Sequence, residues 1–481
     1  KGWAGPLENY EVVDGAVMCK AGKGGTVYTE KEYGDFVVRL EYKLPPGGNN
    51  GLAIRYEVAD YTDPWTQSET ILLHHGFGRS MNFWRAWVPL LARHYRVLRM
   101  DARGCGASGV PPRGETRFVP SEVVVQMPST VQRAQVEAVA QQLGITMVAS
   151  QNLNGSGRTI YQFRSASGAD VSDVIRRLEQ NNIVASAQPN YVFRLNQAQP
   201  AALPREEPVQ KENADRAPLP AGDQTQYMID KLGLTEIHKE TRGRDVSIAV
   251  IDSEVDGKHP DLQPAIKERY APAGGASTPH THGTGMAGAI VSKYKLLGVA
   301  PEANVFAIKV FDEKNASAEA TSFQILQGLD HAIQKGVRII NMSFAGPYDV
   351  MLERKLKEAH DKGIILVAAA GNAGPKSPPL YPAADPNVIA VTAVDMNDQP
   401  FKMANQGKHV AIAAPGVDIL VPSPNDAYQL TTGTSVATAH VSGVIALILE
   451  KRPDLSPDDV RAILASTAKP LPGTRPVQTG A

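Results

Sequence analysis

The sequence predicts an α/β protein whose C-terminal half is a parallel sheet with helices on both faces. From residue 223 to residue 469, short apolar stretches rich in β-branched residues alternate with stretches of helical spacing. These apolar stretches are continuous, which is typical of strands buried on both faces. Apolar residues make up 42 % of the 481 positions, enough for a large core.

The expected elements of this domain alternate along the chain as a parallel sheet requires. Strands are expected at 246–251, 305–310, 337–342, 364–369 and 388–393, with helices at 321–335 and 350–362. Parallel neighbours need crossover connections, so this alternation predicts one domain over 223–469. The Pro- and Gly-rich end, 470–481, is expected to be a disordered tail.

A small α+β module is expected just before this domain, over residues 114–195. Its strand patterns lie at 122–126, 159–164 and 184–194, and its helical patterns at 132–143 and 172–181. Residues 196–222 then carry repeated prolines among charged and small residues. Such a composition cannot bury a core, so we expect an exposed linker there.

Two further segments, 1–57 and 58–113, precede this module, and each is too short to form a complete domain. Residues 1–57 read as strands, with clear alternation at 36–42. Residues 58–113 hold a strand running into His-His-Gly-Phe-Gly, helical spacing at 81–95, and a second strand running into a Gly-rich turn. The chain has no Gly-x-Ser-x-Gly sequence, so this second segment lacks a nucleophile elbow.

Four phrases in residues 223–469 place reactive side chains at predicted strand ends and helix starts. Asp252 ends the strand of Ala-Val-Ile-Asp, and Asn372 follows the strand of Ala-Ala-Ala-Gly-Asn. His282 opens the helix of His-Gly-Thr-Gly-Met-Ala-Gly, and Ser435 opens that of Gly-Thr-Ser-Val-Ala-Thr-Ala-His. The loops after parallel strands gather at one edge of a sheet, so we expect these groups to meet.

Together these side chains supply what catalysis by a serine nucleophile needs. The hydroxyl of Ser435 needs a base, and an imidazole such as that of His282 suits neutral pH. A carboxylate such as that of Asp252 fixes the imidazole tautomer. Asn372 and the backbone N–H groups at the helix start can stabilise an oxyanion. The sequence therefore predicts a catalytic triad with Asn372 as an oxyanion donor.

In the order Asp, His, Asn, Ser, the four phrases resemble those of the subtilisin-like serine peptidases, the subtilases. The resemblance implies a subtilisin-like parallel sheet and a serine endopeptidase that works through an acyl-enzyme. Three positions depart from the family pattern. Gly285 stands where a second His is usual, Ala439 where a Pro is usual, and Glu254 where a Gly is common. None of them removes a triad group.

The resemblance also implies where peptides and ions bind. Extended peptide would pair with Ser343, Phe344, Ala345 and Gly346, and the first specificity pocket would lie between them and Ala369, Ala370 and Gly371. Phe344 is expected to line that pocket. No cofactor is expected. Calcium is common in the family, with Asp256 and Asp261 as candidates here, but no carboxylate loop with calcium-ligand spacing is evident. His280, His259 and His440 are expected to be structural.

Residues 114–195 resemble the inhibitor-like propeptide that precedes subtilase domains, most specifically in Gln-Pro-Asn-Tyr-Val-Phe at 188–193. This implies a self-processing zymogen in which the propeptide is an intramolecular inhibitor and cleavage falls within 195–222. Residues 1–57 resemble the start of the 3-keto-disaccharide hydrolase family, a lectin-like sheet. Residues 58–113 resemble the front of an α/β-hydrolase, so the architecture reads as chimeric.

Other functions remain open from the sequence. Residues 1–57 favour a carbohydrate-active or carbohydrate-binding protein, residues 58–113 an esterase, and an inert peptidase fold would be a scaffold. The charges nearly cancel, 50 acidic against 49 basic, which argues against nucleic-acid partners. No apolar run reaches the roughly 18 residues of a membrane span. Protein or peptide substrates are the expected partners. The given sequence starts at Lys1 with no basic-then-apolar stretch, so we expect either that a signal was removed or that the sequence is a fragment. Because peptidases with propeptides are usually exported, a secreted or periplasmic location is expected.

Overall fold

The computed structural model describes residues 117–165, 170–195, 222–223, 225–272, 278–314 and 317–471, with short strands elsewhere. The chain divides into two units, residues 1–113 and 114–481. The linker and tail predictions fall almost wholly outside the described residues.

The first unit contributes seven described strands. They are β1 (Trp3–Ala4), β2 (Tyr10–Val13), β3 (Ala16–Cys19), β4 (Tyr28–Thr29), β5 (Arg55–Ala59), β6 (Thr70–His74) and β7 (Arg96–Asp101). The two strands predicted beside the Gly-rich turns are β6 and β7, which pair in parallel. The expected strand at 36–42 and helix at 81–95 lie outside the described residues. The boundary placed at residue 57 falls inside β5, and because all of β5 pairs with β7, this strand belongs to the second segment.

The α+β module is a four-stranded antiparallel sheet with two helices. Its elements are β8 (Phe118–Pro128), α2 (Arg133–Leu143), β9 (Ile145–Leu153), β10 (Arg158–Ser165), α3 (Val171–Glu179) and β11 (Ser186–Leu195). The strand order is β9-β10-β8-β11. The sequence did not predict β9, because polar residues interrupt its apolar pattern. Strand β8 is also longer than the predicted 122–126.

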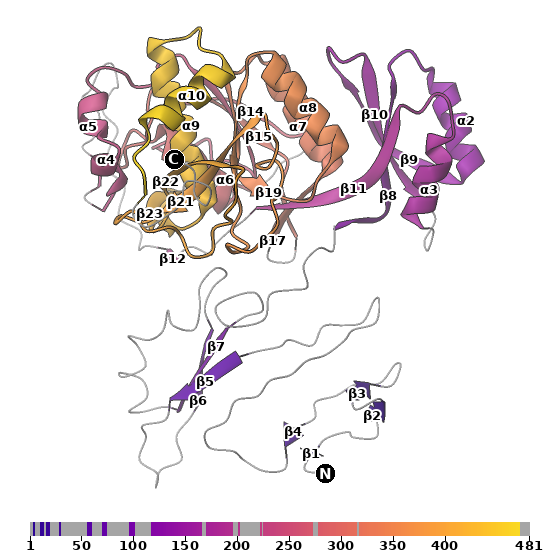
Figure 1. The fold of residues 1–481 in the computed structure, drawn as a ribbon, viewed down its shortest axis with the longest axis horizontal. Coiled ribbons are helices and arrows are strands. Elements are labelled where there is room, and N and C mark those ends of the chain that lie inside the picture. The colour runs from indigo at the N-terminus through magenta and orange to yellow at the C-terminus, as the bar shows by residue number, and fades with distance from the viewer. Residues whose placement is uncertain are drawn as a thin grey trace. The chain divides into compact units, whose positions relative to one another are not determined.

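Each face of this sheet packs on a different layer. Val123 and Val125 point into a core shared with α2 and α3. Val124 and Ile160 point to the other face and pack with Phe323, Leu326 and Met351 of the main domain. Figure 1 shows the module beside helices α7 and α8, with β11 running from the module into the main domain.

The main domain is built on the predicted parallel sheet, in the order β14-β15-β13-β18-β20-β21-β22. The strands are β13 (Ser247–Asp252), β14 (Ile266–Tyr270), β15 (Asn304–Lys309), β18 (Ile339–Met342), β20 (Ile365–Ala369), β21 (Val388–Val394) and β22 (Val410–Pro415). All six neighbouring pairs are parallel. All five predicted strands are present.

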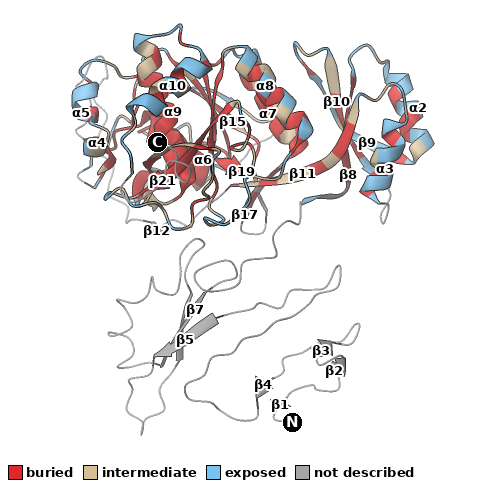
Figure 2. Cartoon of the chain, in the orientation of Figure 1, coloured by how far each residue is buried: buried red, intermediate tan, exposed pale blue. Residues whose placement is uncertain are grey.

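Helices cover both faces of this sheet. Strand β13 shows why its apolar run is continuous: Ile248 and Val250 enter one core, and Ala249 and Ile251 enter the other. The first core takes α6 (Thr281–Val291), α9 (Thr434–Lys451) and α10 (Pro457–Thr467). The second takes α7 (Ser322–Gln334) and α8 (Val350–Asp361). Figure 2 shows the central strands buried and the outer helix faces exposed.

Shorter elements complete the main domain around its sheet. They are α4 (Met228–Lys231), α5 (Leu234–Ile237), β12 (Ala201–Ala202), β16 (Asp312–Lys314), β17 (Ser317–Thr321), β19 (Phe344–Ala345), β23 (Ile419–Ser423) and β24 (Ala427–Thr431). Strand β11 of the α+β module pairs with both β17 and β19, and β12 pairs with β24. The module and the main domain are therefore joined by main-chain pairing.

Candidate active site

The four predicted side chains lie on the expected elements. Asp252 is the last residue of β13, and Asn372 follows β20 by a short turn. His282 is the second residue of α6. Ser435 is the second residue of α9, whose N-cap is Gly433. Its position keeps it in the first helical turn, where backbone N–H groups lack intrahelical acceptors.

Asp252 holds the imidazole of His282 in one orientation. Nδ1 of His282 lies 2.7 Å from Oδ1 and 2.9 Å from Oδ2 of Asp252. Ser253 donates its backbone N–H (2.7 Å) and its hydroxyl (3.1 Å) to Oδ1 of the same carboxylate. Both ionisable side chains are buried. With Nδ1 turned to the carboxylate, Nε2 is the ring nitrogen left to act as a base.

The hydroxyl of Ser435 bonds to Ser343, between β18 and β19, rather than to the imidazole. It donates to the carbonyl oxygen of Ser343 at 3.1 Å, and Ser343 Oγ donates in return to Ser435 O at 3.0 Å. Nε2 of His282 is buried and has no hydrogen-bond partner among the described residues. Catalytic hydrogen bonds are often loose without substrate, so a Ser435 hydroxyl bonded to Ser343 is compatible with a role as nucleophile.

Asn372 is oriented by the residue that precedes the serine. Its Oδ1 accepts from both the backbone N–H and the hydroxyl of Thr434, each at 3.0 Å. Thr434 Oγ1 also accepts from the N–H of Gly371 at 3.2 Å. Because both of these donors bond to the amide oxygen, the N–H₂ group of Asn372 must point away from Thr434. The sequence did not indicate Thr434 as a supporting residue.

The three departures from the family pattern each have a defined environment in the structure. A Cβ on Gly285 would lie 2.9 Å from Val421 Cγ2, so no larger side chain fits without movement. Glu254 accepts from Nε of Arg269 at 2.9 Å. Ala439 is fully buried within α9. None of these contacts displaces Asp252 or His282.

The predicted peptide-binding segment is engaged by the chain itself. Phe344 and Ala345 form β19, which pairs antiparallel with Leu195 and Arg194. The ring of Phe344 lies against Phe193 and Phe311. Ser343 contacts Ser435, Gly346 pairs with Tyr381, and Ala369, Ala370 and Gly371 are buried next to Asn372 in the chain.

The three remaining histidines in the motifs have structural contacts. His280 is the N-cap of α6, accepting from His282 N and bonding Ser253 Oγ at 2.8 Å. His259 contacts the carbonyl of Ala427, and His440 that of Pro415. These contacts agree with structural roles.

The two calcium candidates do not fit a cation. Asp261 Oδ1 accepts three backbone N–H groups, from Tyr294, Lys295 and Leu296, at 2.9–3.0 Å. Its Oδ2 accepts the Tyr428 hydroxyl at 2.6 Å. Asp256 likewise accepts backbone N–H groups at both oxygens. These donors stand where a cation would have to approach, and calcium requires oxygen ligands. Within the described residues, no three His, Cys, Asp or Glu side chains cluster as metal ligands.

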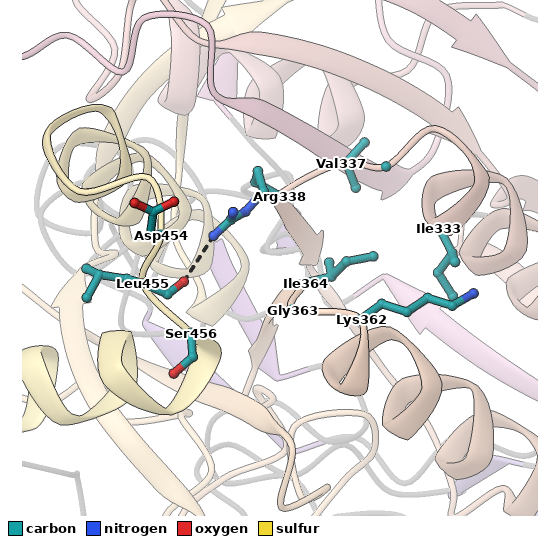
Figure 3. Close-up of a pocket in the computed structure, with 10 residues that line it drawn as sticks. Ile333, Val337, Arg338, Lys362, Gly363, Ile364, Asp454, Leu455 and Ser456 are labelled. Atoms are coloured by element: carbon teal, nitrogen blue, oxygen red, sulfur yellow. Dashed lines mark hydrogen bonds between the residues drawn. The ribbon is translucent and has the colours of Figure 1, made fainter.

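A separate pocket of about 470 Å³ lies at the opposite end of the sheet. It is lined by Arg338 and Ile364, which directly precede β18 and β20, and by residues 454–456. Figure 3 shows Arg338 reaching Leu455 O, a bond of 3.0 Å. Since the reactive side chains stand at the carboxyl ends of the strands, this pocket is not part of the candidate active site.

This fold and this arrangement of side chains are those of the subtilisin class. The Subtilase family profile matches residues 243–479. The chain is 37 % identical to Subtilisin DY of Bacillus licheniformis over 238 residues, covering 48 % of this chain and 86 % of that protein. It is 33 % identical to Thermitase of Thermoactinomyces vulgaris, covering 52 % of this chain and 90 % of that protein. The chain belongs to the subtilase family.

Two further comparisons cover different shares of the chain. Subtilisin E of Bacillus subtilis is 36 % identical over 50 % of this chain, and the match spans 65 % of its length. The crystal structure of fervidolysin from Fervidobacterium pennivorans has the same fold, with a TM-score of 0.63 and 23 % identity, covering 76 % of this chain and 60 % of that one.

The first unit is also matched. A profile for the alpha/beta hydrolase fold covers residues 69–149, which supports the resemblance predicted for residues 58–113. The match runs on into β8, α2 and part of β9, whose sheet is completed by β10 and β11. The resemblance of residues 1–57 to a disaccharide hydrolase stays a prediction. Among the described residues, no helix is long and apolar enough to cross a membrane.

Proposed function

We propose that this chain is a serine endopeptidase that hydrolyses peptide bonds in proteins and is made as a self-processing zymogen. The observation that carries the catalytic part is the Asp252–His282 pair. Nδ1 of the imidazole lies 2.7 Å from the carboxylate, and Nε2 has no hydrogen-bond partner in the described part of the chain. The proposed chemistry uses only side chains and backbone groups of this chain.

The reaction proceeds by acyl transfer. Ser435 Oγ attacks the peptide carbonyl carbon while His282 Nε2 takes its proton. The oxyanion receives hydrogen bonds from Asn372 and from the N–H groups of the first turn of α9. His282 then returns the proton to the leaving amine, and water hydrolyses the acyl-enzyme. Asp252 stabilises the imidazolium that forms in both steps.

Residues 114–195 act as the propeptide. Three features support this role: β11 pairs with the peptide-binding strand β19, the module's sheet packs on Phe323, Leu326 and Met351, and the chain continues from it into the linker. A strand held on β19 excludes other peptides from the same edge. The mature enzyme acts in a secreted or periplasmic location, as expected for an exported zymogen.

Hydrolysis of casein by the purified chain tests the proposal. The wild-type chain releases acid-soluble peptides, and the Ser435→Ala variant loses at least about 10³-fold of this rate, the scale of a lost nucleophile. Ser466→Ala, an exposed serine of α10, is the matched control and keeps the wild-type rate. Equal rates in all three proteins would overturn the proposal.

A further inference from the structure

A second imidazole is connected to the Asp252–His282 pair through the hydroxyl of Ser253. Ser253 Oγ lies 2.8 Å from Nδ1 of His280 and 3.1 Å from Oδ1 of Asp252. Asp252 Oδ1 in turn lies 2.7 Å from Nδ1 of His282. The single proton of the Ser253 hydroxyl therefore has two acceptors within reach, and one of them is the carboxylate of the catalytic pair.

Nδ1 of His280 is a hydrogen-bond acceptor. It accepts the backbone N–H of His282 at 3.3 Å, because His280 is the N-cap of α6. A backbone N–H can only donate, so this ring nitrogen carries a lone pair and the neutral imidazole has its proton on Nε2. In the contact between Ser253 and His280, the hydroxyl is therefore the donor.

The distances favour His280 over Asp252 as the acceptor of the hydroxyl proton. Oδ1 of Asp252 already accepts two donors at 2.7 Å, the backbone N–H of Ser253 and Nδ1–H of His282. These two bonds use both lone pairs of that oxygen. The 3.1 Å between the hydroxyl and Oδ1 is also longer than the usual O–H···O distance of about 2.7–2.8 Å. The contact with His280, at 2.8 Å, is the better hydrogen bond.

The first turn of α6 holds Ser253 in this position. The N–H of Gly283 donates to Ser253 Oγ at 3.0 Å. A Cβ on Gly283 would lie 2.3 Å from Ser253 O, so a larger residue would force the helix away from Ser253. Ser253 is buried, so its proton is shared between the two protein acceptors rather than with solvent.

We propose that His280 is a positioning residue for the catalytic pair, because it accepts the Ser253 hydroxyl proton that would otherwise be donated to Asp252. A further donor on a carboxylate stabilises its charge and weakens its attraction for a partner cation. With the hydroxyl bonded to His280, the charge of Asp252 acts more strongly on the imidazole of His282. This inference rests on the proposed peptidase function, in which Asp252 stabilises the His282 imidazolium.

The charged groups around His280 do not supply the same effect. The backbone N–H of His280 donates to the carbonyl of Glu254 at 2.8 Å, and the Glu254 carboxylate accepts from Nε of Arg269 at 2.9 Å. The titratable groups on the segments that bond to His280 are thus Asp252, Glu254 and His282. Variants at His280 leave Glu254 and Arg269 in place, so the field of that ion pair on His282 stays the same.

The test is the titration of His282 in the full-length Ser435→Ala chain, which lacks the proposed nucleophile. The low-field proton NMR signal of Nδ1–H in its bond to Asp252, identified by its loss in His282→Ala, reports the protonation of this imidazole. Adding His280→Ala lets the Ser253 hydroxyl turn to Asp252. The midpoint of the titration should fall by about 0.5 pH units or more, roughly a threefold loss in proton affinity. His280→Asn keeps both an acceptor and an N-cap, so its midpoint should stay close to that of the parent chain.

Repeating the exchange in a Ser253→Ala background separates this role from simple capping of α6. Without the hydroxyl, His280→Ala should leave the midpoint of the His282 titration unchanged. Equal shifts in the two backgrounds, or a shift in His280→Asn as large as that in His280→Ala, would mean that His280 acts as a cap or through its own charge. Either result overturns the inference, as does the absence of any shift in His280→Ala.

Casein hydrolysis by chains that retain Ser435 tests whether the effect reaches catalysis. The acidic limb of the pH profile of kcat/KM should move to lower pH in His280→Ala by the same amount as the NMR midpoint. An NMR midpoint that moves while this limb stays in place overturns the catalytic role of His280. A parent chain that hydrolyses no casein overturns the proposed function, whereas the NMR titration still decides whether His280 acts on Asp252 through Ser253.

Discussion

At the scale of single residues, the candidate catalytic groups are held by a buried layer of polar side chains. Ser442 donates to Asn341 Oδ1 at 3.0 Å, and Asn341 Nδ2 donates to Ser343 Oγ at 2.9 Å. Ser343 in turn bonds the backbone of Ser435. All of these side chains are buried, so each hydrogen bond that is lost leaves an unsatisfied group.

The sequence predicted the candidate catalytic groups but not the side chains that position them. Asp252, His282, Asn372 and Ser435 stand in distinctive phrases at strand ends and helix starts. Thr434 and Asn341 support them through tertiary contacts, and nothing in their own sequence neighbourhood marks that role. Such contacts join residues far apart in the chain, as with the bond between Asn372 and Thr434.

The Thr434→Val variant tests the orientation of Asn372. It removes the hydroxyl that donates to Asn372 Oδ1 at 3.0 Å and keeps a side chain of similar shape. We expect kcat to fall about tenfold with KM nearly unchanged, as for a transition-state interaction. Asn372→Ala should cost roughly 10²–10³-fold.

A double variant that combines Thr434→Val with Asn372→Ala tests whether Thr434 acts through Asn372. If Thr434 acts through Asn372, adding Thr434→Val to Asn372→Ala should lower kcat little further. Fully multiplicative losses would contradict a shared role.

His440 predicts a pH-dependent stability. Burial lowers the pKa of this imidazole from 6.5 to about 4, so the folded chain holds it neutral. As pH falls from 6.5 toward 4, His440 binds a proton in the unfolded chain but stays neutral in the folded chain. The free energy of unfolding therefore falls by on the order of 3 kcal/mol. Above pH 6.5 this contribution is fully present.

Thermal unfolding of the Ser435→Ala chain between pH 7 and pH 4 measures this contribution without self-digestion. Adding His440→Asn keeps a donor for the Pro415 carbonyl and removes the titrating ring. The decline of Tm with falling pH should therefore be shallower in the double variant than in the Ser435→Ala chain. Parallel curves for the two proteins would show that His440 does not contribute.

At the scale of elements, side chains of β11 cap the N-termini of α7 and α8, the two helices that pack against the α+β module. Asn190 Oδ1 accepts the N–H of Phe323 in α7, and Gln188 Oε1 accepts that of Met351 in α8, each at 3.2 Å. The first N–H groups of a helix have no intrahelical acceptor, so these side chains satisfy groups that would otherwise be buried unpaired. Docking of the α+β module therefore stabilises the first turns of α7 and α8.

Hydrogen exchange on the Ser435→Ala chain tests this link. With Asn190→Ala added, the amide of Phe323 should exchange faster, because its acceptor is gone. The amide of Met351, which depends on Gln188, should be affected less and serves as an internal control. Unchanged exchange at Phe323 would contradict the capping role.

The elements that the sequence predicted are those whose apolar residues follow a clear pattern. Strands β13, β15, β18, β20 and β21 are largely apolar, and α7 and α8 begin within a residue of their predicted starts. By contrast, β9 and β24 mix polar and apolar residues, since they lie at a sheet edge or in a short hairpin. Their pairing partners decide their conformation, and local sequence carries little of that information.

At the scale of the whole molecule, the chain consists of two units, and the proposed function resides in one of them. Residues 114–481 hold the parallel sheet, the α+β module and all four candidate catalytic groups. The fold of this unit follows from its alternating apolar strands and helices. The pairing of β11 with β17 and β19 could not be predicted from the sequence, because strands so distant in the chain leave no local pattern that marks them as partners.

Removing residues 1–113 tests the independence of the second unit. In the Ser435→Ala background, a chain beginning at Gly114 should keep the Tm of the main transition within about 2–4 °C, the shift that roughly 1 kcal/mol produces in a domain of this size. A much larger loss would show that the first unit stabilises the second.

The central claim is that Ser435 is a nucleophile activated by His282 and Asp252. Its most direct test is labelling with a fluorophosphonate probe, followed by peptide mapping. The account predicts one adduct, on Ser435, which is absent in Ser435→Ala and strongly reduced in Asp252→Asn. An adduct on another residue, or casein hydrolysis that continues in Ser435→Ala, would contradict it.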